Sequence, residues 1–324
     1  MTTTANGSTF EYRLGSDGRF VARLRVGDLT IVGVEGDIAR IRDTSGNDLE
    51  ESVRIQTAPG ELELEPAGGR SLGFVFSLGS RRFGRGGDLQ IELPRGTAVS
   101  VETASGAIEV DAIHGPGRYR SASGGIALRG VRGVLDVSAV SGDVTIEADD
   151  EIGLQLNTVS GDARVRAPRI GRLGVNTVSG EVRVDGDLAG AGPYAIGTLS
   201  GDAVVVAHRG LRVDARTITG ELRSDLGSRA QEGGGRRSLI VGDGASVLTF
   251  KSVSGSLRLA TPREAHPAPR TAATPAGHPG DATAPGAGDD DPRLEVLRAL
   301  ERGDLGIDDA TARLAELDGQ ERIR

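Results

Sequence analysis

Apolar and polar side chains alternate along most of this chain, and between residues 103 and 260 the alternation is organised around a recurring Ser-Gly or Thr-Gly pair. The intervals between successive pairs are 18, 18, 19, 19, 21, 19 and 35 residues, the last being close to two periods. A fixed period of this size predicts a repeat architecture. The Ser or Thr of each pair stands at Ser105, Ser123, Ser141, Ser160, Ser179, Ser200, Thr219 and Ser254.

The residues that flank each pair form apolar columns when the repeats are aligned. Three positions after the Ser or Thr stand Ile108, Ile126, Val144, Ala163, Val182, Ala203, Leu222 and Leu257. Four positions before it stand Val101, Tyr119, Val137, Leu156, Val175, Ile196, Ala215 and Phe250. The period of two predicts a short strand on each side of a Gly turn, with one face of each strand pointing inward.

One repeat of this size cannot bury its own apolar face, so we expect each strand to stack on the like strand of the next repeat. An antiparallel sandwich is the alternative fold, but a sandwich would not require like residues to recur in register. The sequence therefore predicts an all-β protein, a right-handed parallel β-helix (β-solenoid), with a small C-terminal α-helical hairpin.

The domain organisation follows from shifts in composition and period. Residues 261–291 are rich in Pro, Ala and Gly and predict a flexible linker. We predict a disordered N-terminus over 1–9, a solenoid over 10–260, a helical hairpin over 292–318 and a tail over 319–324. Two Gly-rich loops are expected inside the solenoid, at 73–87 and 227–237.

The predicted hairpin carries the candidate partner-binding residues. Its apolar side chains recur at helical spacing, yet about 27 residues are too few to form a stable domain alone. We therefore expect a protein partner, or self-association, through these C-terminal helices. The residues concerned are Leu294, Leu297, Leu300, Ile307, Leu314 and Leu317.

Composition excludes several classes of function. The chain has no cysteine, which rules out disulfides and thiolate metal sites. The net charge of -8 argues against nucleic-acid binding. No stretch approaches the roughly 18 apolar residues of a membrane span, so direct membrane insertion is not expected. The polar N-terminus lacks a signal-peptide pattern and predicts a cytoplasmic protein, with any envelope association made through a partner.

Polar columns are the candidate chemistry of the repeats. The acid after the corner Gly could form a cation-binding face, but turn chemistry and solubility, balanced by nearby Arg side chains, is the interpretation we prefer. The Asn and Thr columns predict hydrogen-bond ladders along the stack, with a sugar-binding stripe as the alternative. The acid column comprises Asp143, Asp162, Glu181, Asp202 and Glu221; the ladders would comprise Asn157 with Asn176, and Thr158, Thr177, Thr198 and Thr217.

No motif of an enzyme is present. The chain lacks a Gly-x-Ser-x-Gly elbow, a Walker loop and a His-x-x-x-His pair, so we expect no catalytic, cofactor-binding or metal-ligating residues. Arg81, Arg82 and Arg85 could bind a phosphate or an acidic partner, although a solvated loop is the simpler interpretation.

Residues 20–260 resemble the bacterial putative-adhesin family, a domain of unknown function built from β-strand repeats. The resemblance is carried by the motifs Gly27-Asp-Leu-Thr-Ile-Val-Gly and Ile91-Glu-Leu-Pro-Arg-Gly and by the serial Thr-Val-Ser-Gly-Asp repeats. Residues 293–318 resemble the SHOCT-like helical module that accompanies such solenoids in LiaX-type envelope-stress proteins.

Together these features predict a non-enzymatic scaffold or binding module, in envelope-associated adhesion or stress sensing, whose C-terminal helices recruit a protein. The alternative is a glycan-binding or glycan-active β-helix protein.

Overall fold

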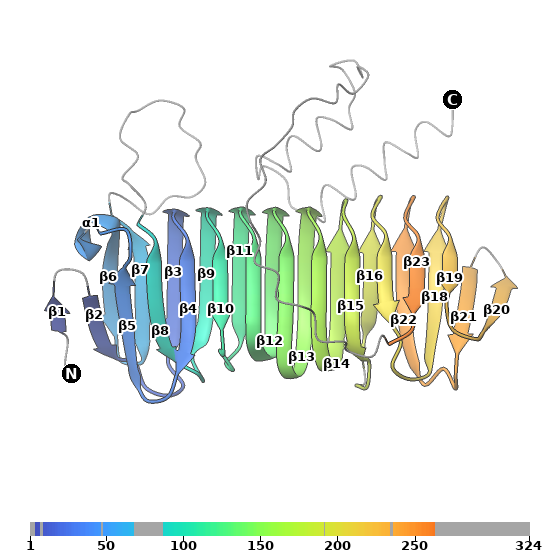
Figure 1. Ribbon diagram of the computed structural model, residues 1–324, viewed down its shortest axis with the longest axis horizontal. Coiled ribbons are helices and arrows are strands. Elements are labelled where there is room, and N and C mark those ends of the chain that lie inside the picture. The colour runs from blue at the N-terminus through green and yellow to red at the C-terminus, as the bar shows by residue number, and fades with distance from the viewer. Residues whose placement is uncertain are drawn as a thin grey trace, which may run out of the picture. The chain divides into compact units, whose positions relative to one another are not determined.

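The computed structural model describes residues 4–6, 9–46, 48–67, 87–190, 192–233 and 236–262, and all of these lie in the first of two compact units, Met1–Glu264 and Ala265–Arg324. The described residues form strands and one short helix, α1 (Leu49–Ser52) (Figure 1). The strands of the first half are β1 (Thr4–Asn6), β2 (Thr9–Arg13), β3 (Arg19–Val26), β4 (Leu29–Val34), β5 (Ile38–Asp43), β6 (Val53–Ala58), β7 (Glu61–Pro66), β8 (Leu89–Pro94), β9 (Ala98–Ser105), β10 (Ile108–Asp111) and β11 (Gly117–Ser123). Those of the second half are β12 (Ile126–Ser141), β13 (Val144–Ser160), β14 (Ala163–Thr177), β15 (Val182–Asp187), β16 (Tyr194–Thr198), β17 (Ala203–Val206), β18 (Leu211–Thr217), β19 (Leu222–Ser224), β20 (Ser228–Gly233), β21 (Arg236–Val241), β22 (Ser246–Ser252) and β23 (Leu257–Ala260).

The strands line up in two facing rows, which we call the first and the second face. On the first face the pairing order is β6–β7–β3–β9–β11–β12–β13–β14–β16–β22–β18–β21–β20. On the second face it is β1–β2–β5–β8–β4–β10–β12–β13–β14–β15–β17–β23–β19. The central strands β12, β13 and β14 belong to both faces, because each continues around the edge of the stack. The predicted parallel solenoid is confirmed for the described residues, while the handedness of its coil stays a prediction.

Each coil consists of a first-face strand, a Gly corner and a second-face strand. In the coil of β9 and β10, for example, Ser105 and Gly106 make the corner. The like residues of neighbouring coils lie in register, as the partners Ser105 and Ser123 show. The column alignment of the repeats is therefore the strand register of the fold.

The spatial order of the coils departs from the chain order at both ends. The coil of β3 and β4 lies between that of β7 and β8 and that of β9 and β10. At the other end, β22 and β23 lie between the β16–β17 coil and the β18–β19 coil. At one end, the chain forms the inner coil of β3 and β4 before the outer coil of β7 and β8. At the other end, it forms the outer coil of β18 and β19 first and then inserts β22 and β23 between that coil and the coil of β16 and β17.

Antiparallel hairpins complete both ends of the stack. The pair β20 and β21 joins β18, so the expected Gly-rich loop over 227–237 is wrong and a β-hairpin occupies that segment. Of the expected disordered N-terminus over 1–9, the structure describes Thr4–Asn6 as β1 and Thr9 as the start of β2, with β1 paired to β2 and β2 to β5. Both segments can pair because an end coil leaves an open strand edge that offers backbone hydrogen-bonding groups.

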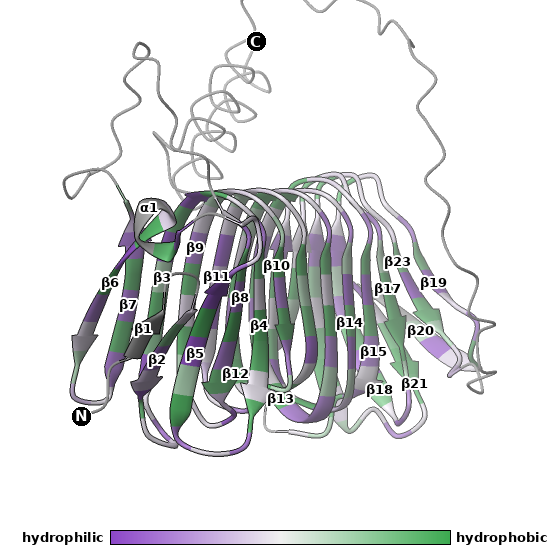
Figure 2. Ribbon diagram, turned by 60° about the vertical axis from the view of Figure 1, so that its left-hand side comes forward, coloured by the Kyte–Doolittle hydropathy of each residue, from purple (hydrophilic) through white to green (hydrophobic). Residues whose placement is uncertain are grey.

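The core is one continuous apolar cluster between the two faces, from Phe10 to Leu259. Its members are the inward residues of the alternation, and Figure 2 shows the resulting bands of apolar and polar residues along the strands. Val182 and Val184 point inward with 1% and 0% of their surface exposed, as the columns predict. The apolar side chains are mostly aliphatic, so the stack is stabilised by many small contacts summed over its length.

The corner glycines form a second continuous feature, a ladder in which backbones touch. A Cβ atom built on any member after the first would lie 1.8 to 2.6 Å from the carbonyl oxygen of the preceding member. No side chain fits at that distance, so the corner requires glycine for close approach even in the last coils, where φ is not positive. In spatial order the ladder comprises Gly27, Gly106, Gly124, Gly142, Gly161, Gly180, Gly201, Gly255 and Gly220.

The largest fully buried side chain, Tyr119, gives the first prediction. Its hydroxyl is buried and has no hydrogen-bond partner among the described residues, and burial raises its pKa. Replacing Tyr119 with Phe removes a polar group that loses its water on folding, so we expect stability to rise by about 1 kcal/mol. Urea unfolding followed by circular dichroism measures this change.

Tyr194 supplies the matched control for that substitution, because its hydroxyl accepts a hydrogen bond from the Gly190 N–H. Tyr194→Phe is expected to lower stability by about 1 kcal/mol. Equal losses from both substitutions would contradict the assignment of an unsatisfied hydroxyl to Tyr119.

Candidate functional site

The repeated corner is where the sequence offered a cation-binding face as the alternative to turn chemistry, and three of its carboxylates bond to the backbone of the stack. The Asp162 N–H donates to Asp143 Oδ1 at 2.9 Å, and the Glu181 N–H donates to Asp162 Oδ1 at 3.0 Å. In the inserted coil, the Ser256 N–H donates to Asp202 Oδ1 at 2.8 Å. Each carboxylate therefore satisfies the N–H that follows the corner Gly of the next coil, which is a structural role.

Two acids of the first coils extend this column, and the repeat alignment had missed them. The Asp28 N–H donates to Asp88 Oδ1 at 2.9 Å, and Asp28 Oδ1 accepts from the Ala107 N–H at 2.8 Å. Asp28 follows Gly27 just as Asp162 follows Gly161, so the Gly-Asp pair was the available signal. Asp88 follows Gly87 in the same way.

The Arg side chains near the column neutralise only part of it. Arg164 pairs with Asp162 at 3.0 Å, and Arg223 pairs with Glu221. Arg258 instead pairs with Asp225 at 2.8 Å, outside the column. Among the described residues no group of three His, Asp or Glu side chains is arranged to hold a metal ion.

Calcium is accordingly expected to change the melting temperature of the protein by no more than about 1 °C at millimolar concentration, because each acid-bearing corner offers a single carboxylate, and those of Asp143, Asp162 and Asp202 are already bonded to backbone. Differential scanning calorimetry with calcium and with EDTA measures the effect. A rise of several degrees that Asp162→Asn abolishes would overturn the structural role of the column.

The two predicted ladders have different outcomes. The Asn ladder is confirmed, since Asn176 Nδ2 donates to Asn157 Oδ1 at 3.0 Å. The Thr ladder is wrong. The hydroxyls of Thr177 and Thr198 are buried and bond within their own corner, as when the Gly201 N–H donates to Thr198 Oγ1 at 2.7 Å, because an inward-facing hydroxyl is closer to its own turn than to the Thr of the next coil. The half-buried Thr217 hydroxyl donates to the Gly255 carbonyl of the adjacent coil at 3.4 Å, not to another Thr. The Thr158 hydroxyl has no partner among the described residues.

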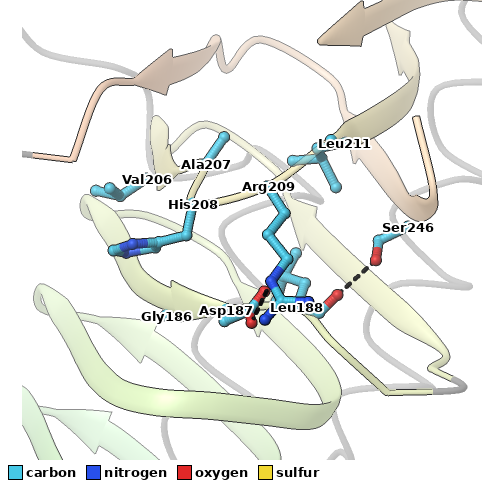
Figure 3. A pocket seen from close by; sticks show the side chains of 10 residues that line it. Gly186, Asp187, Leu188, Val206, Ala207, His208, Arg209, Leu211 and Ser246 are labelled. Atoms are coloured by element: carbon cyan, nitrogen blue, oxygen red, sulfur yellow. Dashed lines mark hydrogen bonds and ion pairs between the residues drawn. The ribbon is translucent and has the colours of Figure 1, made fainter. Parts of the chain in front are cut away.

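A shallow hollow opens where the inserted strand β22 meets the connections that follow β15 and β17. Figure 3 shows Arg209 pointing to Asp187, with a distance of 2.8 Å, and Ser246 donating to the carbonyl of Leu188. His208 lies at the rim, with Nε2 at 2.7 Å from Asp185 Oδ1. No repeat signal in the sequence pointed to this hollow, because the hollow exists only where the coils are out of chain order.

The groups of the hollow largely neutralise one another. Asp185 contacts His208, and Asp187 contacts Arg209 through Oδ2, while Asp187 Oδ1 is buried and has no hydrogen-bond partner in the part of the chain that the structure describes. No nucleophile with an adjacent base lies there, so the hollow provides no catalytic arrangement of the kind that acyl or phosphoryl transfer requires.

Several predicted residues lie outside the described residues. They are the partner-binding set Leu294, Leu297, Leu300, Ile307, Leu314 and Leu317, and the loop residues Arg81, Arg82 and Arg85. The predicted α-helical hairpin lies outside them as well. Within the described residues no helix has the length and apolar character needed to cross a membrane.

The family of this stack follows from a comparison with protein-family models. A family model described as Toastrack DUF4097 matches residues 73–260, more than half of the chain. The chain belongs to the Toastrack DUF4097 family. The resemblance to a β-repeat domain of unknown function is thereby confirmed, and the SHOCT-like resemblance of residues 293–318 stays a prediction. The Toastrack stack of this chain also includes β3, β4 and β7, which precede the matched range.

Three solved structures are similar to this Toastrack chain at low identity. A protein from Clostridium sporogenes titled a putative cell adhesion protein is 13% identical, with 79% of this chain and 100% of that chain covered and a TM-score of 0.25. A putative adhesin from Bacteroides fragilis is 12% identical, with 78% and 95% covered and a TM-score of 0.43. A putative lipid binding protein from Parabacteroides distasonis is 14% identical, with 79% and 98% covered and a TM-score of 0.38. A search of curated proteins finds no match.

Proposed function

We propose that this protein is a non-enzymatic binding scaffold whose C-terminal segment recruits a protein partner or a second copy. The supporting observation is that the solenoid and the C-terminal segment offer different kinds of side chain for binding. The repeated polar side chains of the solenoid bond to their own backbone, as Asp162 does to the Glu181 N–H, while the unassigned apolar residues gather at helical spacing beyond the linker. Envelope-associated adhesion or stress sensing is the setting that the family resemblance suggests.

Apolar side chains at helical spacing favour a helix-in-groove mode of binding. Six such residues in a segment of about 27 are too many to leave in water, and the segment is too short to bury them by itself. The linker that composition predicts over residues 261–291 would keep the segment close to the scaffold without fixing its orientation, which would raise the effective concentration of whatever the segment binds.

The test is the double substitution Leu297→Glu and Leu314→Glu in the full chain. We expect it to abolish self-association in light scattering, or partner recovery in a pull-down, because both anchors of the predicted apolar face become charged. The strand signal in circular dichroism should stay unchanged.

The matched control places the same two charges on polar positions of the same segment, Arg298→Glu and Thr311→Glu, and should bind as the wild type does. If the double Leu variant and the wild type behave identically in size and in recovery, the recruitment proposal is wrong.

The glycan-binding alternative gains no support from the described residues. Sugar sites usually offer an exposed aromatic ring, and every Phe and Tyr ring that the structure describes is buried. These rings belong to Phe10, Tyr12, Phe20, Tyr119, Tyr194 and Phe250.

A further inference from the structure

An apolar row runs along the outside of the first face, one residue before each corner Ser or Thr. The strand pairings place its members side by side, and the backbone bond from the Ser254 N–H to the Leu199 carbonyl continues the row into the inserted coil. We call this row the apolar ridge. In spatial order it comprises Ala104, Ala122, Val140, Val159, Val178, Leu199, Val253 and Ile218.

The ridge keeps the alternation of inward and outward residues but departs from the pattern in which outward residues are polar. In β12, Val137 and Ala139 point inward and Ser138 points outward, yet the next outward position is Val140. The ridge is partly accessible, since Val253 is 36% and Ile218 63% exposed, while Val140, Val159, Val178 and Leu199 are half-buried. An outward apolar residue repeated in eight coils is not required by the core, and such surfaces mark interaction sites.

The spacing of the ridge fits a helix that lies along the stack. Parallel strands lie about 4.8 Å apart, so seven steps make a ridge of about 34 Å. A helix places side chains on one face at about 5.4 Å per turn and spans that length with about 22 residues. An extended peptide repeats one face every ~6.8 Å, which matches the ridge poorly.

The charge beside the ridge specifies the chemistry of that helix. The acid column lies three residues beyond the ridge, across the corner, and three residues span at most about 10 Å. Asp143, Glu181 and Asp202 have no ion-pair partner in the described part of the chain, although Asp143 and Asp202 accept backbone hydrogen bonds. A Lys or Arg side chain on the flank of a bound helix can reach these carboxylates.

A second copy of this chain is a poorer occupant. Two ridges packed with antiparallel stacks would place acid column against acid column. Packed with parallel stacks, the acids would face the outward polar residues on the other flank of the ridge. In the central coils these are Ser138, Asn157, Asn176 and Gly197, none of which is cationic. In the last two coils they are Lys251 and Arg216, so a second copy would find cationic partners at one end of the ridge alone.

We propose that the apolar ridge and the acid column together form the docking site for an amphipathic helix of a partner protein, apolar on one side and rich in Lys or Arg along its flank. The residues of this site lie in the solenoid and not in the C-terminal segment. The docking proposal can therefore be tested independently of the recruitment proposal.

The test uses the full chain and a fluorescent 22-residue amphipathic peptide of Leu and Lys, with binding measured by fluorescence anisotropy at two salt concentrations. We expect saturable binding that weakens with salt, and no binding of a Leu and Glu peptide of the same pattern. The variant Val159→Thr with Val178→Thr keeps the shape and strand preference of both residues and should bind at least 10-fold more weakly.

Two further variants keep the test decisive. Val204→Thr changes an outward apolar residue on the second face, away from the ridge, and should bind as the wild type does. Asp143→Asn, Glu181→Gln and Asp202→Asn together retain an acceptor oxygen at each corner and should weaken binding several-fold while flattening its salt dependence.

The proposal is overturned if the Leu and Lys peptide does not bind, or if the ridge variant, checked as folded by circular dichroism, binds as the wild type does. If the ridge variant does not fold, unchanged affinity in the acid variant overturns it instead. Ridge-dependent binding to neutral lipid vesicles without binding to the peptide would identify a lipid surface in its place.

Discussion

Replacing Gly161 with alanine is expected to lower the free energy of unfolding by about 3 kcal/mol or more. The Cβ would lie 2.4 Å from the Gly142 carbonyl oxygen, and the φ of +120° at this position disfavours any L side chain. The neighbouring coil cannot withdraw without breaking the bond that joins the two corners, in which the Gly142 N–H donates to the Ser160 carbonyl. Urea unfolding followed by circular dichroism measures the loss.

Two other glycines separate the causes of that loss. Gly36 has a φ of +113° with no atom within 4 Å of a built Cβ, so Gly36→Ala should lose only about 1–2 kcal/mol from backbone strain. Gly153 has a regular φ and its nearest atom, Arg172 Cβ, is 3.9 Å away, so Gly153→Ala should be close to neutral. If Gly161→Ala and Gly36→Ala lose the same amount, close backbone approach does not explain the ladder.

Replacing Val184 with Asp is expected to cost about 4 kcal/mol, since the carboxylate would be buried among apolar side chains without a partner. Val184 has 0% of its surface exposed and lies in register between Val165 and Val205 of the adjacent coils. The folded fraction at a fixed urea concentration should fall accordingly.

Thr145→Asp is the control for charge without burial. Thr145 points outward on the same face and lies in register with Arg164, which can pair with the new carboxylate. The free energy of unfolding of the Thr145→Asp variant should stay within about 0.5 kcal/mol of that of the wild type. A tolerated Val184→Asp would contradict the inward orientation of that column.

The strands were predictable because their signal is local and repeated. Val182 and Val184 alternate with the outward Arg183, and six other coils of the repeat carry the same pair of inward apolar residues, so an error in one coil does not shift the rest. The corner was predictable for the same reason, and the bonds of Asp162 agree with the preference for turn chemistry.

Hydrogen-bond partners within the coils were less predictable. The column of Asn157 and Asn176 identified a true ladder, because both amides point outward and can reach along the stack. The same reasoning failed for Thr198, whose hydroxyl lies inside the corner beside the Gly201 N–H. A column of like residues shows which side chains are neighbours, but their direction decides what they bond to.

The sequence by itself determined the strand period, the inward residues and the need for glycine at each corner, because these depend on neighbours in the chain and on a repeated register. Only the tertiary structure decided the order of the coils at the ends. The interval of 35 residues between Thr219 and Ser254 is compatible with a skipped coil, yet the coil of Ser254 lies before that of Thr219 in the stack. Every coil presents nearly the same columns to its neighbours, so local pattern cannot rank them. The β20–β21 hairpin pairs with β18 on its far side, which leaves the near side of β18 to β22 and so fixes the order.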